Sequence, residues 1–156
     1  MKIDLIAVGR LGRTAENGLA ADYLQRASSA GRSQGLGPAG LIEVQPKGPS
    51  VPAQDAEVIL SNIPAGAAVF VCDERGEAMG SRAFAAQIEK LRDSGAPRLC
   101  VVIGGPDGLD QSVRDRATQL IGFGAWTWPH ALARVMAAEQ IYRAVTILAG
   151  GPYHRD

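Results

Sequence analysis

Three side chains with complementary chemistry follow one another near the end of the chain: Tyr153, His154 and Arg155. An aromatic ring can stack on a flat ligand, and an imidazole with an unperturbed pKa of about 6.5 exchanges a proton near neutral pH. A guanidinium group holds oxyanions bidentately. A random tail rarely combines these groups, so the segment is a candidate site. A disordered end without a function is the alternative interpretation.

Two glycine-containing segments are candidates for a ligand pocket. Gly104 and Gly105 follow an apolar run, and ligands of open α/β sheets bind beyond the carboxyl ends of strands. The segment Phe123–His130 contains Trp126 and Trp128, which can wall an adenine site. A tight turn explains the first segment equally well, and burial in the core explains Trp128 at least as well. The first segment matches neither a dinucleotide fingerprint nor a Walker loop.

Other reactive side chains have structural explanations that suffice. His130 follows Pro129 at the start of a predicted helix, where a structural hydrogen bond accounts for it. Glu139 and Arg143 have the i,i+4 spacing of a surface ion pair. Spacing alone assigns no ligand role to Arg134.

The cysteines and the apolar runs bear on the cellular compartment. Cys72 and Cys100 lie in apolar runs, and their spacing of 28 residues matches no zinc ligand set. We therefore expect buried thiols, no disulfide and no metal. The opening segment 1–5 contains an acid within its only apolar stretch, which argues against a signal peptide. No apolar run approaches the ~20 residues that span a bilayer. These features predict a cytoplasmic protein without a membrane segment.

Apolar runs alternate with amphipathic segments along the chain. Predicted strands are residues 2–8, 41–45, 67–72 and 99–103; predicted helices are 15–27, 54–63, 82–94, 111–120 and 132–149; predicted loops include 28–40 and 73–80. Ser81 and Asp110 are predicted helix N-caps. The order predicts an α/β fold with a mainly parallel sheet flanked by helices. We find no repeat or linker, so we predict a single domain over residues 1–156.

Five sequence motifs follow one another with a characteristic order and spacing. They are residues 102–109 (VIGGPDGL), residues 127–130 (TWPH), Arg134, residues 139–144 (EQIYRA) and residues 152–155 (PYHR). The opening segment 2–9 (KIDLIAVG) and the length of the chain fit the same pattern. Together they resemble the bacterial large-subunit ribosomal RNA pseudouridine N3-methyltransferases, which are small members of the SPOUT (α/β-knot) superfamily.

The resemblance implies a homodimer, a C-terminal trefoil knot in the chain and the cofactor S-adenosylmethionine. A dimer also accounts for a last helix that is apolar on most sides. The implied cofactor contacts are Cys72, Gly104, Phe123, Gly124, Ala125, Trp126, Thr127 and Trp128. Relatives often have a branched aliphatic residue in place of Cys72 and smaller side chains in place of Trp126 and Trp128. Contacts through the backbone would tolerate these differences, whereas contacts through side chains would change the affinity for the cofactor.

The implied reaction is methyl transfer to N3 of a pseudouridine in 23S ribosomal RNA within the assembled ribosome. Within that reaction, His154 is the candidate general base for the N3 proton. Arg155 is the candidate to hold a phosphate or a uracil carbonyl, and Tyr153 to stack on or orient the base. Two alternatives stay open: a non-catalytic ribosome-associated RNA-binding protein with the same fold, and a SPOUT methyltransferase that acts on transfer RNA.

The charge balance limits how such a protein can bind RNA. The chain has 16 basic and 16 acidic residues, so its formal net charge is zero. Proteins that hold nucleic acid by bulk electrostatics usually have a clear basic excess. We therefore expect weak binding to free RNA, with a few placed cations such as Arg10, Arg13 and Arg155 setting the register on a ribosome.

Overall fold

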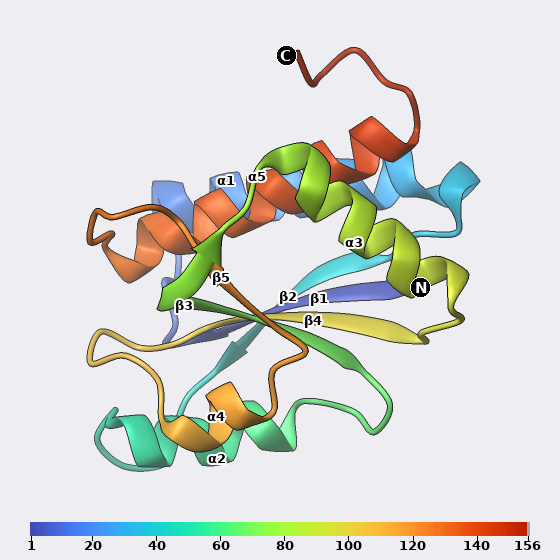
Figure 1. Ribbon diagram of the computed structural model, residues 1–156. Coiled ribbons are helices and arrows are strands. Elements are labelled where there is room, and N and C mark those ends of the chain that lie inside the picture. Colours follow the sequence, from blue (N-terminus) through green and yellow to red (C-terminus); the bar gives the residue numbers. More distant parts are fainter. Residues whose placement is uncertain (156) are drawn as a thin grey trace.

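The computed structural model describes residues 1–155; Asp156, the last residue of the predicted 1–156 domain, lies outside the described residues. Figure 1 shows the order of the elements. The strands are β1 (Lys2–Val8), β2 (Ala39–Val44), β3 (Ala68–Ala78), β4 (Arg98–Ile103) and β5 (Gln119–Gly122). The helices are α1 (Ala15–Gly31), α2 (Pro52–Ser61), α3 (Ser81–Asp93), α4 (Gln111–Asp115) and α5 (His130–Leu148), with the short 3-10 helix η1 (Arg32–Gln34) after α1.

The five strands form one parallel sheet in the order β2-β1-β4-β3-β5. Helices α1, α3 and α5 cover one face, and α2 and α4 cover the other (Figure 1). This arrangement confirms the predicted α/β fold with a parallel sheet flanked by helices. Because all strands run in the same direction, their carboxyl ends and the loops that follow them gather along one edge of the sheet.

The central strand β4 shows why its sequence LCVVI is apolar throughout. Successive side chains of a strand point to opposite faces. Leu99 and Val101 pack in the core beneath α1 and α5, whereas Cys100 and Val102 pack in the core over α2. Both faces of the strand are therefore buried, as is typical of parallel sheets covered by helices.

Two predicted boundaries are wrong at the sheet edge. The predicted loop 73–80 instead continues β3 to Ala78, and the predicted helix 111–120 ends at Asp115. The short strand β5 follows that helix and pairs with β3 on both sides of a register shift between Cys72 and Glu77. The pairing resumes at Glu77 and skips residues 73–76, whose side chains include three charged ones. Local composition therefore predicted a loop there.

The strands β3 and β5 cross at two glycines. A Cβ atom built on Gly76 would collide with the backbone of Ile121. A Cβ atom on Gly122 would lie 2.6 Å from the carbonyl oxygen of Gly76. Only glycine allows the two backbone segments to approach this closely.

The predicted loop 28–40 is also partly wrong, because α1 continues to Gly31 and η1 follows. The hydroxyls of Ser28 and Ser29 donate to carbonyl oxygens four residues earlier, which serves these polar side chains within the helix. A Cβ on Gly31 would lie 2.6 Å from the carbonyl oxygen of Leu36, so glycine here permits a tight chain reversal.

One helix cap is confirmed and one is wrong. Asp110 caps α4, since its carboxylate accepts from the backbone N–H of Ser112 at 2.9 Å. Gly80, not Ser81, is the N-cap of α3, and the Ser81 hydroxyl donates to Gln140 Oε1 at 2.9 Å. The other elements lie where they were predicted, with ends displaced by one or two residues. Across residues 1–155, no helix has the length and apolar character to cross a membrane.

Candidate functional site

A cleft of about 540 Å³ opens at the carboxyl edge of the sheet, beside the loop between β5 and α5. Its volume lies in the range of about 300–1,000 Å³ that is typical of small-molecule sites. Seven of the eight predicted cofactor residues line it: Cys72, Phe123, Gly124, Ala125, Trp126, Thr127 and Trp128. The structure therefore brings together Cys72 of β3 and residues of the β5–α5 loop.

Two tryptophans shape the outer wall of the cleft. Trp128 is half-buried against the core, and its indole N–H donates to the carbonyl oxygen of Phe123 at 3.2 Å. Trp126 is 78% exposed, and its ring centroid lies 6.0 Å from that of Trp128. Gly124 has a φ of +90°, which glycine adopts readily, in the loop between β5 and α5. Trp128 is thus both a core residue and a lining residue.

Cys72 lies in the middle of β3, where the register shift begins, and lines the cleft. Burial raises the pKa of its thiol to about 12, so the thiol stays protonated at neutral pH. A protonated thiol is a poor nucleophile. Both cysteines are free; Cys100 is buried as predicted, whereas Cys72 is only partly buried.

Gly104 is the one predicted cofactor residue that does not line the cleft. It is buried, and a Cβ there would lie 2.7 Å from Cγ of Leu109. Its neighbour Ile103 lines the cleft instead. Glycine is therefore favoured at position 104 because the Leu109 side chain packs directly against its backbone.

Sequence reasoning missed three cleft residues that directly follow Cys72: Asp73, Glu74 and Arg75. The Asp73 side chain is only 4% exposed; Oδ2 accepts from Arg114 Nε at 2.8 Å and Oδ1 from the backbone N–H of Arg75 at 2.9 Å. Charged residues immediately after a buried strand were the available signal, because that position is the carboxyl edge of a parallel sheet.

The predicted tail residues are brought together against the middle of α5. The Tyr153 hydroxyl donates to Glu139 Oε1 at 3.0 Å, and Arg143 Nε donates to the same oxygen at 2.9 Å. Nη1 of Arg143 lies 3.3 Å from Nδ1 of His154. The tail is ordered here, and the predicted ion pair between Glu139 and Arg143 anchors it. Arg155 is exposed.

Aromatic and cationic groups enclose the Tyr153 ring. Its centroid lies 4.6 Å from that of Tyr142, and the Arg143 guanidinium lies 4.8 Å from it. Burial, followed by hydrogen bonding with Tyr23 and Glu139, raises the pKa of Tyr153 above its usual value. The phenol therefore stays protonated and acts as a hydrogen-bond donor.

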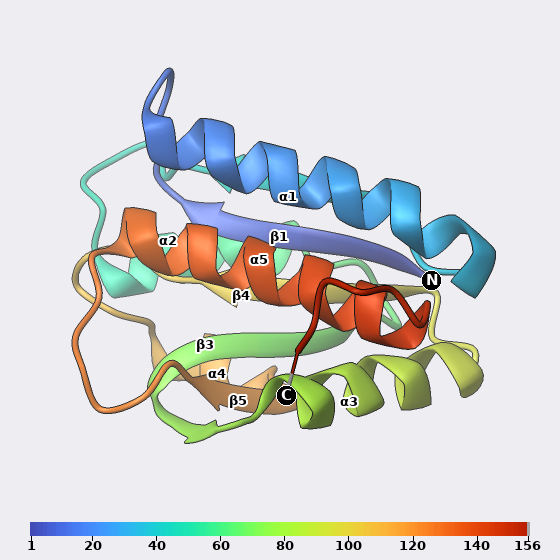
Figure 2. The ribbon, with the colours of Figure 1, turned by 90° about the horizontal axis from the view of Figure 1, so that it is seen from above.

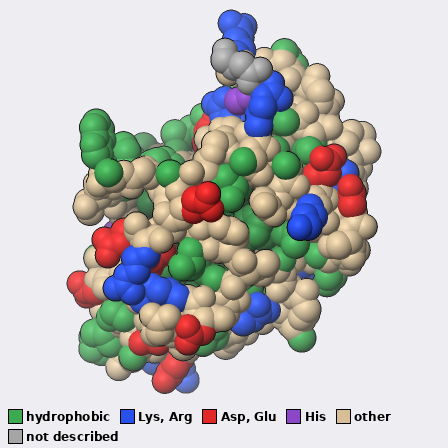
Figure 3. All heavy atoms as spheres, viewed as in Figure 1, with side chains coloured by type: hydrophobic (Ala, Val, Ile, Leu, Met, Phe, Trp, Pro, Cys, Tyr) green, Lys and Arg blue, Asp and Glu red, His purple; other side chains and the backbone are tan. Residues whose placement is uncertain are grey.

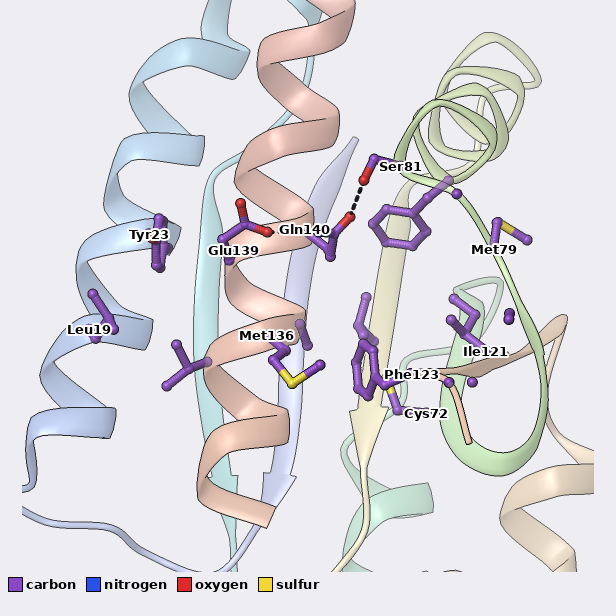
Figure 4. Close-up of a pocket in the computed structure, with 18 residues that line it drawn as sticks. Leu19, Tyr23, Cys72, Met79, Ser81, Ile121, Phe123, Met136, Glu139 and Gln140 are labelled. Carbon is purple, nitrogen blue, oxygen red and sulfur yellow. Dashed lines mark hydrogen bonds between the residues drawn. The ribbon is translucent and has the colours of Figure 1, made fainter. Parts of the chain in front are cut away.

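A second, mostly apolar cavity of about 590 Å³ lies between α1, α3 and α5 (Figure 4). Leu19 and Tyr23 of α1 and Met136 of α5 form part of its wall. Cys72 and Phe123 line both this cavity and the cleft. Figure 4 shows the two side chains next to each other.

The tail does not line the cleft of its own chain. Figure 2 shows the tail folding back over α5, while the β5–α5 loop lies at the opposite end of that helix. Ala133 lines the cleft and Glu139 anchors the tail, so about 9 Å of helix separates them at 1.5 Å per residue. Glu139 also lines the apolar cavity, which places the tail anchor at the cavity wall.

His130 and Arg134 lie in the first turns of α5. His130 is half-buried at the first residue of the helix and lines neither the cleft nor the apolar cavity. Arg134 is fully buried and donates to the carbonyl oxygens of Val8, at the end of β1, and of Gly9 in the loop that follows. Within the described part of the chain, no cluster of three or more metal-ligating side chains occurs.

Comparison with known proteins places this geometry in a family. The model of a family described as "Predicted SPOUT methyltransferase" matches residues 1–154. Proteins named "Ribosomal RNA large subunit methyltransferase H" are similar over the whole chain. The one from Caulobacter sp. (strain K31) is 53% identical, with 100% of both chains covered. The one from Phenylobacterium zucineum is 51% identical, also with 100% of both chains covered.

A solved structure supports the fold. The crystal structure named "Probable Methyltransferase from Bordetella pertussis Tohama I" has a TM-score of 0.53 and 18% sequence identity. The match covers 92% of this chain and 96% of that one. At this identity the likeness concerns the fold alone.

Proposed function

This chain belongs to the SPOUT methyltransferase family, and on that premise we propose that it methylates N3 of a pseudouridine in 23S ribosomal RNA. The methyl donor is S-adenosylmethionine. The carrying observation is the cleft at the carboxyl edge of the sheet, where seven residues implied as cofactor contacts converge. The names of relatives that are about half identical over their full length support the RNA substrate.

The cleft fits the cofactor in size and in lining. The β5–α5 loop offers backbone groups from Phe123 to Thr127, and Ile103 and Trp128 offer apolar surface for an adenine ring. Cys72 flanks the site from the middle of β3, and Gly104, directly after β4, shapes the turn beside it. When bound, S-adenosylmethionine supplies an electrophilic methyl group.

The tail residues act on the RNA base. His154 accepts the proton of N3, which is weakly acidic, and Arg155 holds a phosphate or a uracil carbonyl. Tyr153 orients the base from the position that its hydrogen bond to Glu139 sets. Alignment of the base with the methyl donor supplies much of the acceleration, because positioning removes entropy from the barrier.

The active form is a homodimer built around the apolar cavity. Leu19 is 46% exposed and Leu132 is 41% exposed, and a second copy would cover such surfaces. Because Glu139 belongs to both the cavity wall and the tail anchor, the tail lies beside this interface. A partner's tail can therefore reach a cleft that the tail of the same chain does not line.

The C-terminal part of the chain forms a trefoil knot in this proposal. Membership of the family supports it. The tight crossing of Gly76 and Gly122 also supports it, because β5 passes directly against the extended part of β3 before the chain continues into α5.

The substrate is the ribosomal RNA in the assembled ribosome, in the cytoplasm. The zero net charge supports a structured particle over free RNA, since bulk attraction to arbitrary RNA would be weak. On the face in Figure 3, acidic and basic side chains are interspersed and form no extended basic field.

The test is incorporation of a labelled methyl group into assembled ribosomes, separated subunits, free ribosomal RNA and transfer RNA. We expect label in the ribosomal RNA of ribosomal particles, at a pseudouridine. Label in transfer RNA alone would contradict the proposal and favour a transfer RNA enzyme. Particle binding without any methylation, together with no cofactor binding by calorimetry, would favour a non-catalytic binding protein.

A further inference from the structure

Two exposed arginines lie in the short loop between β1 and α1. Neither Arg10 nor Arg13 makes a hydrogen bond or an ion pair with any of residues 1–155 in the structure. Other arginines, such as Arg26 and Arg92, pair with carboxylates. We infer that Arg10 and Arg13 bind backbone phosphates of the RNA whose base enters the cleft. This inference rests on the proposed function.

The backbone that carries the two arginines is fixed at several points. The N–H of Gly9 donates to the Val44 carbonyl oxygen at 2.8 Å, and the N–H of Leu11 donates to Glu43 Oε1 at 2.9 Å. The Asn17 side chain donates to the Gly12 carbonyl oxygen at 2.8 Å. Little backbone entropy is therefore lost when the loop binds a ligand.

The buried guanidinium of Arg134 completes this support. It contacts Glu43 Oε1 at 2.6 Å and donates to the carbonyl oxygens of Val8 at 3.1 Å and Gly9 at 3.0 Å. Its Nε is buried without a partner among the described residues. A buried ion pair adds little net stability compared with apolar packing, so its presence favours a positioning role.

Arg134 also leaves the charge of the loop uncancelled. The Glu43 carboxylate accepts a hydrogen bond from the backbone of the loop, and Arg134 forms an ion pair with it. Glu16 lies in the first turn of α1, where a negative charge stabilises the helix N-terminus. The guanidinium groups of Arg10 and Arg13 therefore face solvent as the free cations of the loop.

The loop borders the cleft across the first turns of α5. Ala133 lines the cleft, and the next residue, Arg134, holds Val8 and Gly9. Figure 2 shows the β1–α1 loop and the β5–α5 loop at the same end of the molecule. An RNA strand that delivers a base to the cleft thus passes its backbone near the β1–α1 loop.

The spacing of the two arginines suits two phosphates of one strand. Three residues span at most about 11 Å, and both side chains are long and exposed. Arginine binds phosphate bidentately, which gives orientation as well as attraction. Such contacts set the register of the RNA and carry no sequence information.

The test compares Arg10→Gln/Arg13→Gln with Lys2→Gln/Arg32→Gln. Both double variants remove two exposed positive charges, but Lys2 and Arg32 lie at the amino edge of the sheet. The readouts are the Kd for large ribosomal subunits at several salt concentrations, the KM for methylation, and the Kd for S-adenosylmethionine by calorimetry.

We expect the first variant to raise the Kd and KM for the particle at least about tenfold and to leave cofactor binding unchanged. The slope of log Kd against log salt should fall by about 1.4, at about 0.7 for each single-strand phosphate contact. Equal effects of the two double variants would overturn the inference, as would a weakened cofactor affinity in the first. Binding that responds as expected without any methylation would contradict the proposed function and leave this surface confirmed.

Discussion

Tyr153 and Glu139 tie the C-terminal tail to the middle of α5 through a hydrogen bond of 3.0 Å from the phenol to the carboxylate. The same carboxylate oxygen accepts from Arg143, which in turn contacts the His154 ring. One acidic side chain thus holds the phenol and the cation that adjoins the imidazole. The position of the candidate base depends on a residue that is not itself in the tail.

Removal of residues 153–156 should abolish methylation and leave the rest of the protein intact. The tail supplies the proposed base and cation, but none of its described residues, 153–155, lines the cleft. We expect no methyl incorporation into ribosomal particles. Cofactor affinity, measured by calorimetry, and dimerisation, measured by sedimentation, should be unchanged. Full activity of the shortened protein would contradict the role of the tail.

The change Tyr153→Phe separates the anchor from the aromatic ring. It keeps the ring contact with Tyr142 and removes the hydroxyl, with its hydrogen bonding to Glu139 and Tyr23. We expect a several-fold lower kcat, an unchanged Kd for the cofactor and a loss of stability of about 1 kcal/mol. Steady-state kinetics and urea unfolding check this. If kcat is unchanged, the hydrogen bond does not position the tail.

The change Gly122→Ala should prevent correct folding. A Cβ at this position would lie 2.6 Å from the carbonyl oxygen of Gly76, and neither backbone can move without breaking the pairing of β3 with β5. The matched control is Gly18→Ala in α1, where a Cβ meets nothing within 4 Å and alanine favours the helix by about 1 kcal/mol. Thermal unfolding of both variants checks this. Wild-type stability of the Gly122 variant would show that the crossing is looser than described.

Alkaline pH should weaken the fold partly through Cys100. Burial, followed by the charge of Asp4, raises the pKa of this thiol from 9.0 to about 11 in the folded protein. Above pH 9 the unfolded chain releases the thiol proton that the folded chain keeps, so this contribution to stability falls as the pH rises from about 9 to 11. Urea unfolding between pH 8 and 10.5 should show a shallower decline for Cys100→Ala than for the unchanged protein. Parallel declines would contradict the shift.

Local patterns predicted the strands and helices that have long apolar or amphipathic signals. The run Leu99–Ile103 is buried on both faces, and its sequence shows this directly. The four-residue strand β5 has too short a signal, because its pairing with β3 comes from residues about 50 positions away. The glycines and tryptophans of the β5–α5 loop indicated a possible pocket segment, and the resemblance to a known family supplied the individual contact residues, such as Cys72.

The contacts that anchor the β1–α1 loop and the tail could not be predicted from the sequence either, because they join residues from separate parts of the chain. Arg134 contacts Glu43 and Val8, which lie 91 and 126 residues away in the chain. Spacing within one helix cannot show such partners. The pair Glu139 and Arg143 was predicted from its spacing, but the role of that pair as the seat of the tail depends on a chain reversal after Leu148.

The cleft wall holds both tryptophans of the protein, Trp126 and Trp128. Intrinsic fluorescence excited at the indole band therefore originates entirely from the β5–α5 loop. Trp126 is largely in solvent and Trp128 is half-buried, so a change in emission colour reports directly on how that loop is hydrated. Ligand binding in the cleft can therefore be followed by the tryptophan fluorescence of the unlabelled protein.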